Sequence, residues 1–165
     1  MKNKDIPAHK LQKHYIDLNG SSEGISKNIQ NRMHRYVNIA KALYRKGCIS
    51  NGRTFNVSFG VYRDKVLAIG INDYSKIMPE YSRQLNLKYK RYGEKSYIPC
   101  IHSEMSCLLK LGADNCDGIS VYNVRIDKNG HCKNSQPCHN CYAALMQMNV
   151  KHIYYYDDNM NICCI

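Results

Sequence analysis

Two short motifs constrain the fold of this 165-residue chain more than any other feature of its sequence. They are His102-Ser-Glu104 and Pro137-Cys138-His-Asn-Cys141. Cys138 and Cys141 are three residues apart, so on a helix they lie on one face and can bind one ion. His102 and Glu104 are two residues apart, about 200° around an ideal helix, so both cannot be ligands on a regular helical face. The histidine and the carboxylate therefore need different roles, and a helix start provides the geometry for that.

A proline shortly before each motif favours this arrangement. Pro99 precedes the first motif and Pro137 the second, and proline is common at helix N-termini. Two positive helix ends would then meet at one ion and favour thiolates around it. The sequence therefore predicts two helices that begin at a shared metal site.

The ligand types at this site indicate a catalytic zinc. One histidine and two cysteines leave a fourth tetrahedral position for water, as in catalytic zinc sites. Zinc lowers the pKa of bound water from 15.7 to about 7, and Glu104 can carry the released proton. The chemistry implied is hydrolytic attack at an amidine-like ring carbon, with ammonia leaving. The alternative is a closed structural zinc with Cys132 or His139 as fourth ligand, in which Glu104 is an ordinary first-turn acid.

Hydrophobic periodicity predicts alternating helices and strands. Helices are expected over residues 26–45, 102–111 and 138–149, and strands over 54–63, 66–71, 119–126 and 151–156. Gly47 ends the first helix, and Asp64-Lys65 turns the first two strands into a hairpin. Residues 72–99 show no clean period and are expected to form a long loop, and a loop of this length is usually functional or disordered. The order α-β-β-α-β-α-β predicts an α/β sandwich with a sheet of mixed strand direction.

The end of the chain predicts one more strand. Only nine residues follow Tyr156, fewer than the dozen or more that a parallel crossover needs, so a fifth strand must be antiparallel. We therefore expect the α/β sandwich to contain a mixed five-stranded sheet that ends in a hairpin. Residues 1–25 are polar and turn-rich and are expected to form a flexible or loosely attached arm before the domain at 26–165.

The combination of His-x-Glu with Pro-Cys-x-x-Cys resembles the signature of the zinc-dependent cytidine deaminase superfamily of CMP/dCMP type. The resemblance spans residues 26–165 and implies a zinc-dependent deaminase domain with the cytidine-deaminase-like fold. It implies His102, Cys138 and Cys141 as zinc ligands and Glu104 as the catalytic proton shuttle.

The resemblance also suggests substrate-binding residues. Asn72, after Gly70-Ile71, matches the position where family members place a substrate-contacting asparagine; the alternative is a turn residue that ends a strand. Nucleoside deaminases carry a ribose-binding glutamate two residues later, where this chain has Tyr74, which argues against free cytidine. Tyr156, at the end of the last long strand, is a further candidate that would stack on a base.

Charge is concentrated in the first part of the chain. Residues 1–95 contain 19 Lys/Arg and 7 Asp/Glu, whereas residues 96–165 contain 5 and 6. Lys88, Lys90 and Arg91 alternate with tyrosines in the 72–99 loop, which suits single-stranded nucleic acid. The alternatives are a solvated loop and a lysine excess from an AT-rich genome, such as that of a large virus or a protist.

We therefore expect a zinc-dependent deaminase that converts cytosine to uracil on a phosphorylated substrate, a cytosine nucleotide or single-stranded nucleic acid. The same chemistry applies at C6 of adenine. The alternative is a catalytically inactive deaminase fold that acts as a nucleic-acid-binding or structural protein. The nine cysteines, the lack of a signal-like start and the lack of an apolar run of ~20 residues favour an intracellular protein without a membrane partner. The oligomeric state is left open, a homo-oligomer included.

Overall fold

The computed structural model describes residues 21–47, 54–77 and 100–165. The first of these ranges contains helix α2 (Lys27–Arg45), and the second contains strands β1 (Phe55–Tyr62), β2 (Lys65–Ile71) and β3 (Asp73–Ile77). The third contains β4 (Cys100–Ile101), α4 (Ser103–Leu111), a 3-10 turn (Ala113–Asn115), β5 (Ser120–Ile126), β6 (Cys132–Lys133), α5 (His139–Gln147), β7 (His152–Tyr156) and β8 (Ile162–Cys164). None of the helices described is long and apolar enough to cross a membrane.

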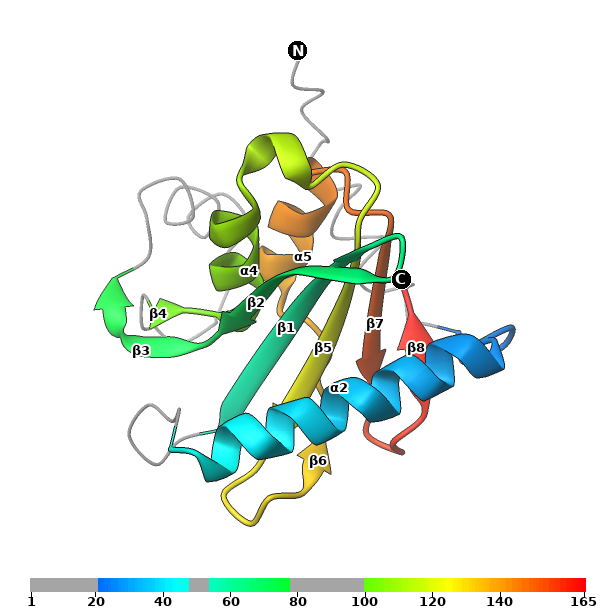
Figure 1. The fold of residues 1–165 in the computed structure, drawn as a ribbon, viewed down its shortest axis with the longest axis vertical. Helices are drawn as coiled ribbons and strands as arrows, with labels where there is room; N and C mark the ends of the chain where they lie inside the picture. Colours follow the sequence, from blue (N-terminus) through cyan, green and yellow to red (C-terminus); the bar gives the residue numbers. More distant parts are fainter. Residues whose placement is uncertain (1–20, 48–53, 78–99) are drawn as a thin grey trace, which may run out of the picture.

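The main sheet has mixed strand direction, as predicted (Figure 1). Its strands follow the order β2-β1-β5-β7-β8, and β6 pairs with β5 outside this path. β1 is antiparallel to both β2 and β5, whereas β5 and β7 are parallel. β8 returns antiparallel to β7, with Tyr154 opposite Cys164, which confirms the expected closing hairpin.

Two short pairings were not predicted from the sequence. β3 and β4 form a separate two-stranded sheet in which Asp73 lies opposite Ile101, so the expected loop begins with a strand. β4 and β6 have two residues each, too few to show a period of two in the sequence. The β3–β4 pair still matters for the site, because β4 leads directly into His102.

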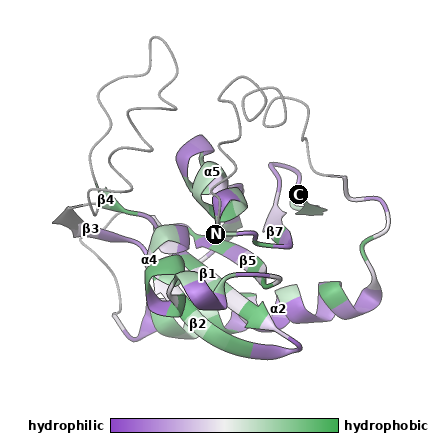
Figure 2. Ribbon diagram, turned by 90° about the horizontal axis from the view of Figure 1, so that it is seen from above, coloured by the Kyte–Doolittle hydropathy of each residue, from purple (hydrophilic) through white to green (hydrophobic). Residues whose placement is uncertain are grey.

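The sheet separates two hydrophobic cores, with α2 on one face and α4 and α5 on the other (Figures 1 and 2). Strand alternation explains the division, since successive side chains point to opposite faces. On β1 the residues Phe55, Val57, Phe59 and Val61 belong to the core under α2. The other face of the sheet contributes Val121 and Ile153 to the core under α4 and α5. We call these the α2 core and the α4/α5 core.

α2 begins and ends as the sequence predicts. Ser26 is its N-cap, and the Ser26 hydroxyl accepts a hydrogen bond from the backbone N–H of Ile29 at 3.4 Å. Gly47 follows the helix with a φ of 74°, a conformation that glycine adopts without strain. The helix packs aromatic side chains on the sheet, and the Tyr36 and Phe59 rings stack with centroids 4.6 Å apart.

Gly70 on β2 sets how closely α4 approaches the sheet. A Cβ atom at this position would overlap the carbonyl oxygen of Ser103 and the backbone nitrogen of Cys107. Only a residue without a side chain lets the first turn of α4 lie directly on β2. Lys110 adds a second tie, because its ammonium donates a hydrogen bond to the carbonyl of Ile69 at 2.6 Å.

Candidate active site

The two motifs lie at two helix starts, as the sequence predicts. His102 is the N-cap of α4 and Cys138 is the N-cap of α5. Both residues have extended backbones, with ψ angles of 159° and 162°, so each chain segment enters its helix at these positions. Cys141 lies in the first turn of α5, and Glu104 lies in the first turn of α4. The helix ends therefore place all four side chains near the positive ends of two helix dipoles.

His102, Cys138 and Cys141 form a cluster that fits a metal ion. Their ligand atoms all lie within 4.8 Å of one another, and each cysteine Sγ lies 3.4 Å from Nδ1 of His102. Tetrahedral zinc with Zn–S of 2.3 Å and Zn–N of about 2.05 Å separates sulfur from nitrogen by about 3.6 Å. The observed separations match this value closely, so the three residues fit a single zinc ion. Glu104 is not part of this cluster.

Neither candidate for a fourth protein ligand belongs to the cluster. Cys132 packs against the α2 core, on the other face of the sheet. His139 is adjacent to Cys138 in sequence, but among the described residues the cluster consists of one histidine and two cysteines. The arrangement therefore favours three protein ligands over the closed structural site.

The protons of the three ligands are coupled. The side chains of Cys138 and Cys141 are hydrogen-bonded to each other. This contact holds the pKa of Cys138 well below its usual range and raises the pKa of Cys141. Burial lowers the pKa of His102, but hydrogen bonds with Cys100 and Cys138 outweigh burial and raise it to about 11. Zinc binding requires a neutral imidazole and two thiolates, so His102 and Cys141 must release protons when the ion binds.

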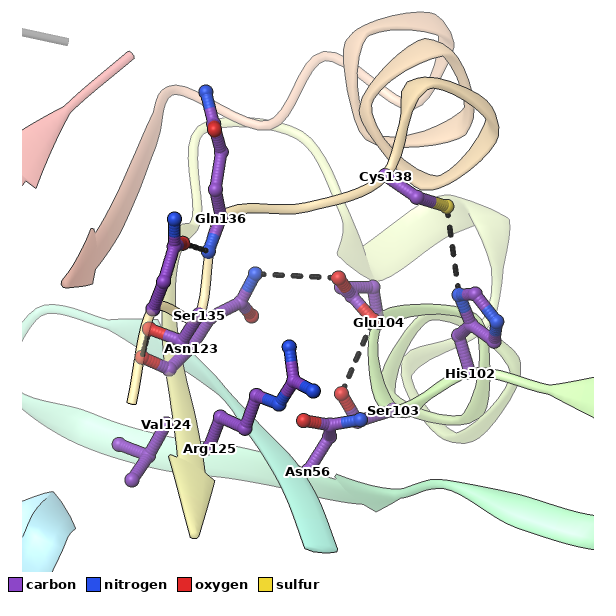
Figure 3. A pocket seen from close by; sticks show the side chains of 11 residues that line it. Asn56, His102, Ser103, Glu104, Asn123, Val124, Arg125, Ser135, Gln136 and Cys138 are labelled. Carbon is purple, nitrogen blue, oxygen red and sulfur yellow. Dashed lines mark hydrogen bonds between the residues drawn. The ribbon is translucent and has the colours of Figure 1, made fainter. Parts of the chain in front are cut away.

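Glu104 is held by a ring of buried polar side chains, of which Figure 3 shows Ser103 and Asn123 in contact with its carboxyl group. Its Oε2 lies 3.1 Å from the Ser103 hydroxyl, and its Oε1 lies 3.4 Å from Nδ2 of Asn123. Ser58 closes the ring, because its hydroxyl lies 2.8 Å from both the Ser103 hydroxyl and Oδ1 of Asn123. The four side chains are at most 7% exposed, so these contacts decide how the carboxyl group is oriented.

A count of hydrogens shows that this ring suits a protonated carboxyl group. The ring has four contacts, and each needs one hydrogen. The Ser58 hydroxyl, the Ser103 hydroxyl and the Asn123 amide together provide three of these hydrogens. A proton on Glu104 provides the fourth hydrogen and completes the ring. Burial acts in the same direction and raises the pKa of Glu104, although the positive charge of His102 opposes it. Glu104 is therefore placed where it can take up and return a proton.

A pocket of about 170 Å³ opens beside these groups (Figure 3). One face of the sheet forms a wall of the pocket. On this face β1 and β5 place Asn56 opposite Arg125 and Ser58 opposite Asn123. Residues that line the pocket are Asn56, His102, Ser103, Glu104, Asn123, Val124, Arg125, Asn134, Ser135, Gln136 and Cys138. The pocket thus combines two members of the candidate metal-binding group, His102 and Cys138, with a carboxyl group and several amides.

The structure does not bring the predicted substrate-binding residues to this pocket. The Asn72 side chain is buried and bonds to the backbone of β1, where it accepts from the N–H of Asn56 at 2.8 Å and donates to the carbonyl of Thr54 at 3.1 Å. Tyr74 lies on β3 and does not line the pocket. The ring of Tyr156 belongs to the α2 core, although its backbone bonds to Ser135 of the pocket.

The three cationic candidates, Lys88, Lys90 and Arg91, lie outside the described residues. Their role in nucleic-acid binding stays a prediction. Four polar residues of the site were not predicted from the sequence, and they alternate with apolar residues along β1 and β5: Asn56, Ser58, Asn123 and Arg125. Strand alternation is the signal that could have pointed to them, but alone it does not say which face carries a site.

Comparisons with known proteins give one family match and two similar solved structures. The chain matches the sequence profile of the "cytidine and deoxycytidylate deaminase zinc-binding region" over residues 30–157. Among solved structures it is similar to the dCMP deaminase of cyanophage S-TIM5 in apo form, with 19% identity, 81% of this chain and 86% of that chain covered, and a TM-score of 0.46. The same cyanophage enzyme in complex with dCMP and dUMP gives 17% identity, coverage of 81% and 84%, and a TM-score of 0.46. A search among curated proteins gives no significant match.

The profile match spans most of the chain, including both motifs and every strand of the main sheet except β8. The helix layers and the sheet order follow the cytidine-deaminase-like α/β/α sandwich that the motifs imply, and zinc is the cofactor that the three clustered ligands fit. The chain belongs to the family of cytidine and deoxycytidylate deaminases that share this zinc-binding region.

Proposed function

We propose that this protein is a zinc-dependent hydrolase that deaminates cytosine to uracil on a phosphorylated substrate. The observation that carries the proposal is the position of Glu104, held by its polar ring at the pocket beside the His102–Cys138–Cys141 cluster. A carboxyl group that lies beside a candidate metal site without being one of its ligands is suited to proton transfer.

The proposed reaction adds water to C4 of the base and releases ammonia. The water oxygen bonds to C4, the bond from C4 to the exocyclic nitrogen breaks, and the ring keeps a carbonyl group. When bound, zinc supplies the Lewis acidity that lowers the pKa of water to about 7. His102, Cys138 and Cys141 would hold the ion, and this assignment is part of the proposal.

Glu104 would move the protons. Its carboxyl group accepts one proton from the attacking water and passes it to N3 of the ring. It then accepts the hydroxyl proton of the C4 adduct and passes it to the exocyclic amine, so that C4 keeps a carbonyl group and the amine leaves as ammonia. The ring around Glu104 suits this role because it accommodates the carboxyl group with its proton and also supplies hydrogen bonds to both oxygens without it. Asn123 and Ser103 would keep the two oxygens oriented through the cycle.

A deamination panel tests the proposal. The substrates are cytidine, deoxycytidine, dCMP, dCTP, and single- and double-stranded oligonucleotides, with ammonia release as the readout and E104A as the inactive control. We expect turnover of a phosphorylated cytosine substrate, and a loss of roughly 10²–10⁴-fold in E104A with zinc content unchanged. Absence of turnover on every substrate would instead support the inactive scaffold.

The oligonucleotides in the panel also test Lys88, Lys90 and Arg91. If these side chains contact the phosphates of a strand, the affinity for a single-stranded oligonucleotide should fall steeply with salt. Replacing all three by Gln should then change the slope of log K against log salt by about two units, at about 0.7 for each phosphate contact. An unchanged slope would favour a free nucleotide.

A further inference from the structure

We propose that Arg125 forms an anion subsite in the pocket, which binds the phosphate of the cytosine substrate. The inference rests on the proposed function and deepens it, because it assigns the part of the pocket that distinguishes a nucleotide from a nucleoside. No comparison with known proteins assigns a role to this residue.

Arg125 lies two residues along β5 from Asn123, the residue that contacts Glu104. Asn123 and Arg125 are two residues apart on β5, so their side chains share a face and their Cα atoms are about 7 Å apart. Asn123 bonds to Glu104, whereas Arg125 lies opposite Asn56 on the neighbouring strand. Arg125 and Asn56 both line the pocket. If the base lies against Glu104, its sugar and phosphate extend along the pocket past Asn123, toward Arg125.

The guanidinium group of Arg125 has unused binding capacity. Its Nε atom is buried and has no hydrogen-bond partner within the part of the chain that the structure describes. The ion pairs within the described residues have Arg32, His131 and Lys133 as their basic members, and Arg125 takes part in none of them. A buried N–H of a charged group is costly without an acceptor, so a ligand oxygen would satisfy it.

The chemistry of the group favours a phosphate. A guanidinium is always charged and presents donors in a planar fork that matches two phosphate oxygens. Arg125 is also the single arginine between residues 96 and 165, so it is not part of the lysine-rich first half of the chain. A positive group that has no acidic partner among the described residues, in the pocket proposed for an uncharged base, is suited to the anionic part of the substrate.

Substrate selectivity tests the subsite. The ratio of kcat/KM for dCMP to that for deoxycytidine should fall roughly 10- to 100-fold in R125Q, because hydrogen bonds to charged groups of this kind contribute that much. R125K should recover part of the ratio, since it restores the charge without the fork. The matched control is K133Q, which removes the charge directly opposite Arg125 in the ladder, from a side chain that lies near Asp127 and does not line the pocket.

Product binding gives a readout that does not need turnover. Isothermal titration of dUMP and deoxyuridine should show that wild type prefers dUMP, and that R125Q loses this preference while K133Q keeps it. A single-stranded oligonucleotide with one cytosine is titrated in the same way, to distinguish a phosphate within a strand from that of a free nucleotide. R125Q should lower the affinity for whichever of the two ligands supplies the phosphate bound by Arg125.

The outcomes separate this inference from the proposed function. A wild-type dUMP preference that survives in R125Q, or a loss that is equal for dUMP and deoxyuridine, would overturn the subsite. If wild type turns over no substrate but still binds dUMP through Arg125, the deaminase proposal fails and the anion subsite stands. Thermal unfolding of R125Q and R125K confirms that each variant is folded before these comparisons are made.

Discussion

Nδ2 of Asn123 on β5 donates a hydrogen bond to Oε1 of Glu104 on α4, at 3.4 Å. This contact joins the sheet to the helix layer at the point where proton transfer is proposed. With Ser103 at the other carboxyl oxygen, it fixes the plane of the carboxyl group from two elements of the fold. If Glu104 carries the proton as proposed, Asn123 is a positioning residue for it.

The N123D variant should lose activity while it keeps its zinc. The change removes the amide donor and places a second carboxylate beside Glu104, and like charges at this distance disfavour ionisation of both groups. We expect kcat to fall about 100-fold, within the range typical of proton-transfer groups, with a smaller change in KM. Steady-state kinetics and zinc analysis measure both effects.

The control for N123D is N129D, the same substitution in the exposed turn after β5. It should leave kcat unchanged. A wild-type kcat in N123D would show that the ring does not position Glu104.

The E104Q variant should be more stable than wild type at neutral pH when a chelator has removed metal. Burial raises the pKa of Glu104, so the neutral form is the one that folding favours. The stability that this group contributes is complete below its unfolded pKa and is lost as pH rises through the folded pKa. Glutamine is neutral at every pH, and its amide supplies the fourth hydrogen of the ring.

Urea unfolding at several pH values tests this expectation. The difference in free energy of unfolding between E104Q and wild type should be small near pH 4 and increase toward pH 8. A difference that does not depend on pH would mean that Glu104 ionises normally in the folded protein. E104Q should also be catalytically inactive, since an amide cannot carry the proton.

The C138A variant should lose zinc. Removing one of three protein ligands should weaken zinc binding by roughly 100-fold or more, since even outer-shell partners contribute 10–100-fold. Metal analysis after dialysis should find one zinc per wild-type chain and much less in C138A, with a lower melting temperature because metal binding contributes to folding.

C132A is the matched control for the metal site. Cys132 packs against the α2 core, so its replacement should leave the zinc content at one per chain. An equal loss of zinc in C132A would restore the closed four-ligand site and remove the position for water.

The sequence was sufficient to predict the metal cluster and most of the fold. His102, Cys138 and Cys141 were predictable because helix-start signals and ligand spacing are local properties of the chain. The main strands were predictable because each is long enough to show its period, and the β7–β8 hairpin followed from the short length of chain after Tyr156.

Properties that depend on the register between strands could not be predicted. Asn123 and Arg125 alternate with apolar residues on β5, and only the pairing with β1 shows that they face the pocket instead of solvent. Tyr156 illustrates the same limit. Its position at the end of a strand suggested a base-stacking role, but the alternation of side chains along β7 places its ring in the α2 core. Asn72 directly follows β2, as in the alternative interpretation of this residue, and its amide binds the neighbouring backbone instead of lining the pocket.

The separation of the two cores by the sheet has a consequence for how such a chain can change over generations. Every group of the proposed chemistry lies on the α4/α5 side, and residues such as Tyr36 and Phe59 pack on the other. A substitution under α2 therefore alters packing that is separated by the sheet from the residues of the proposed chemistry. Stability can thus be adjusted on one face of the sheet without a direct contact to the proposed active site on the other.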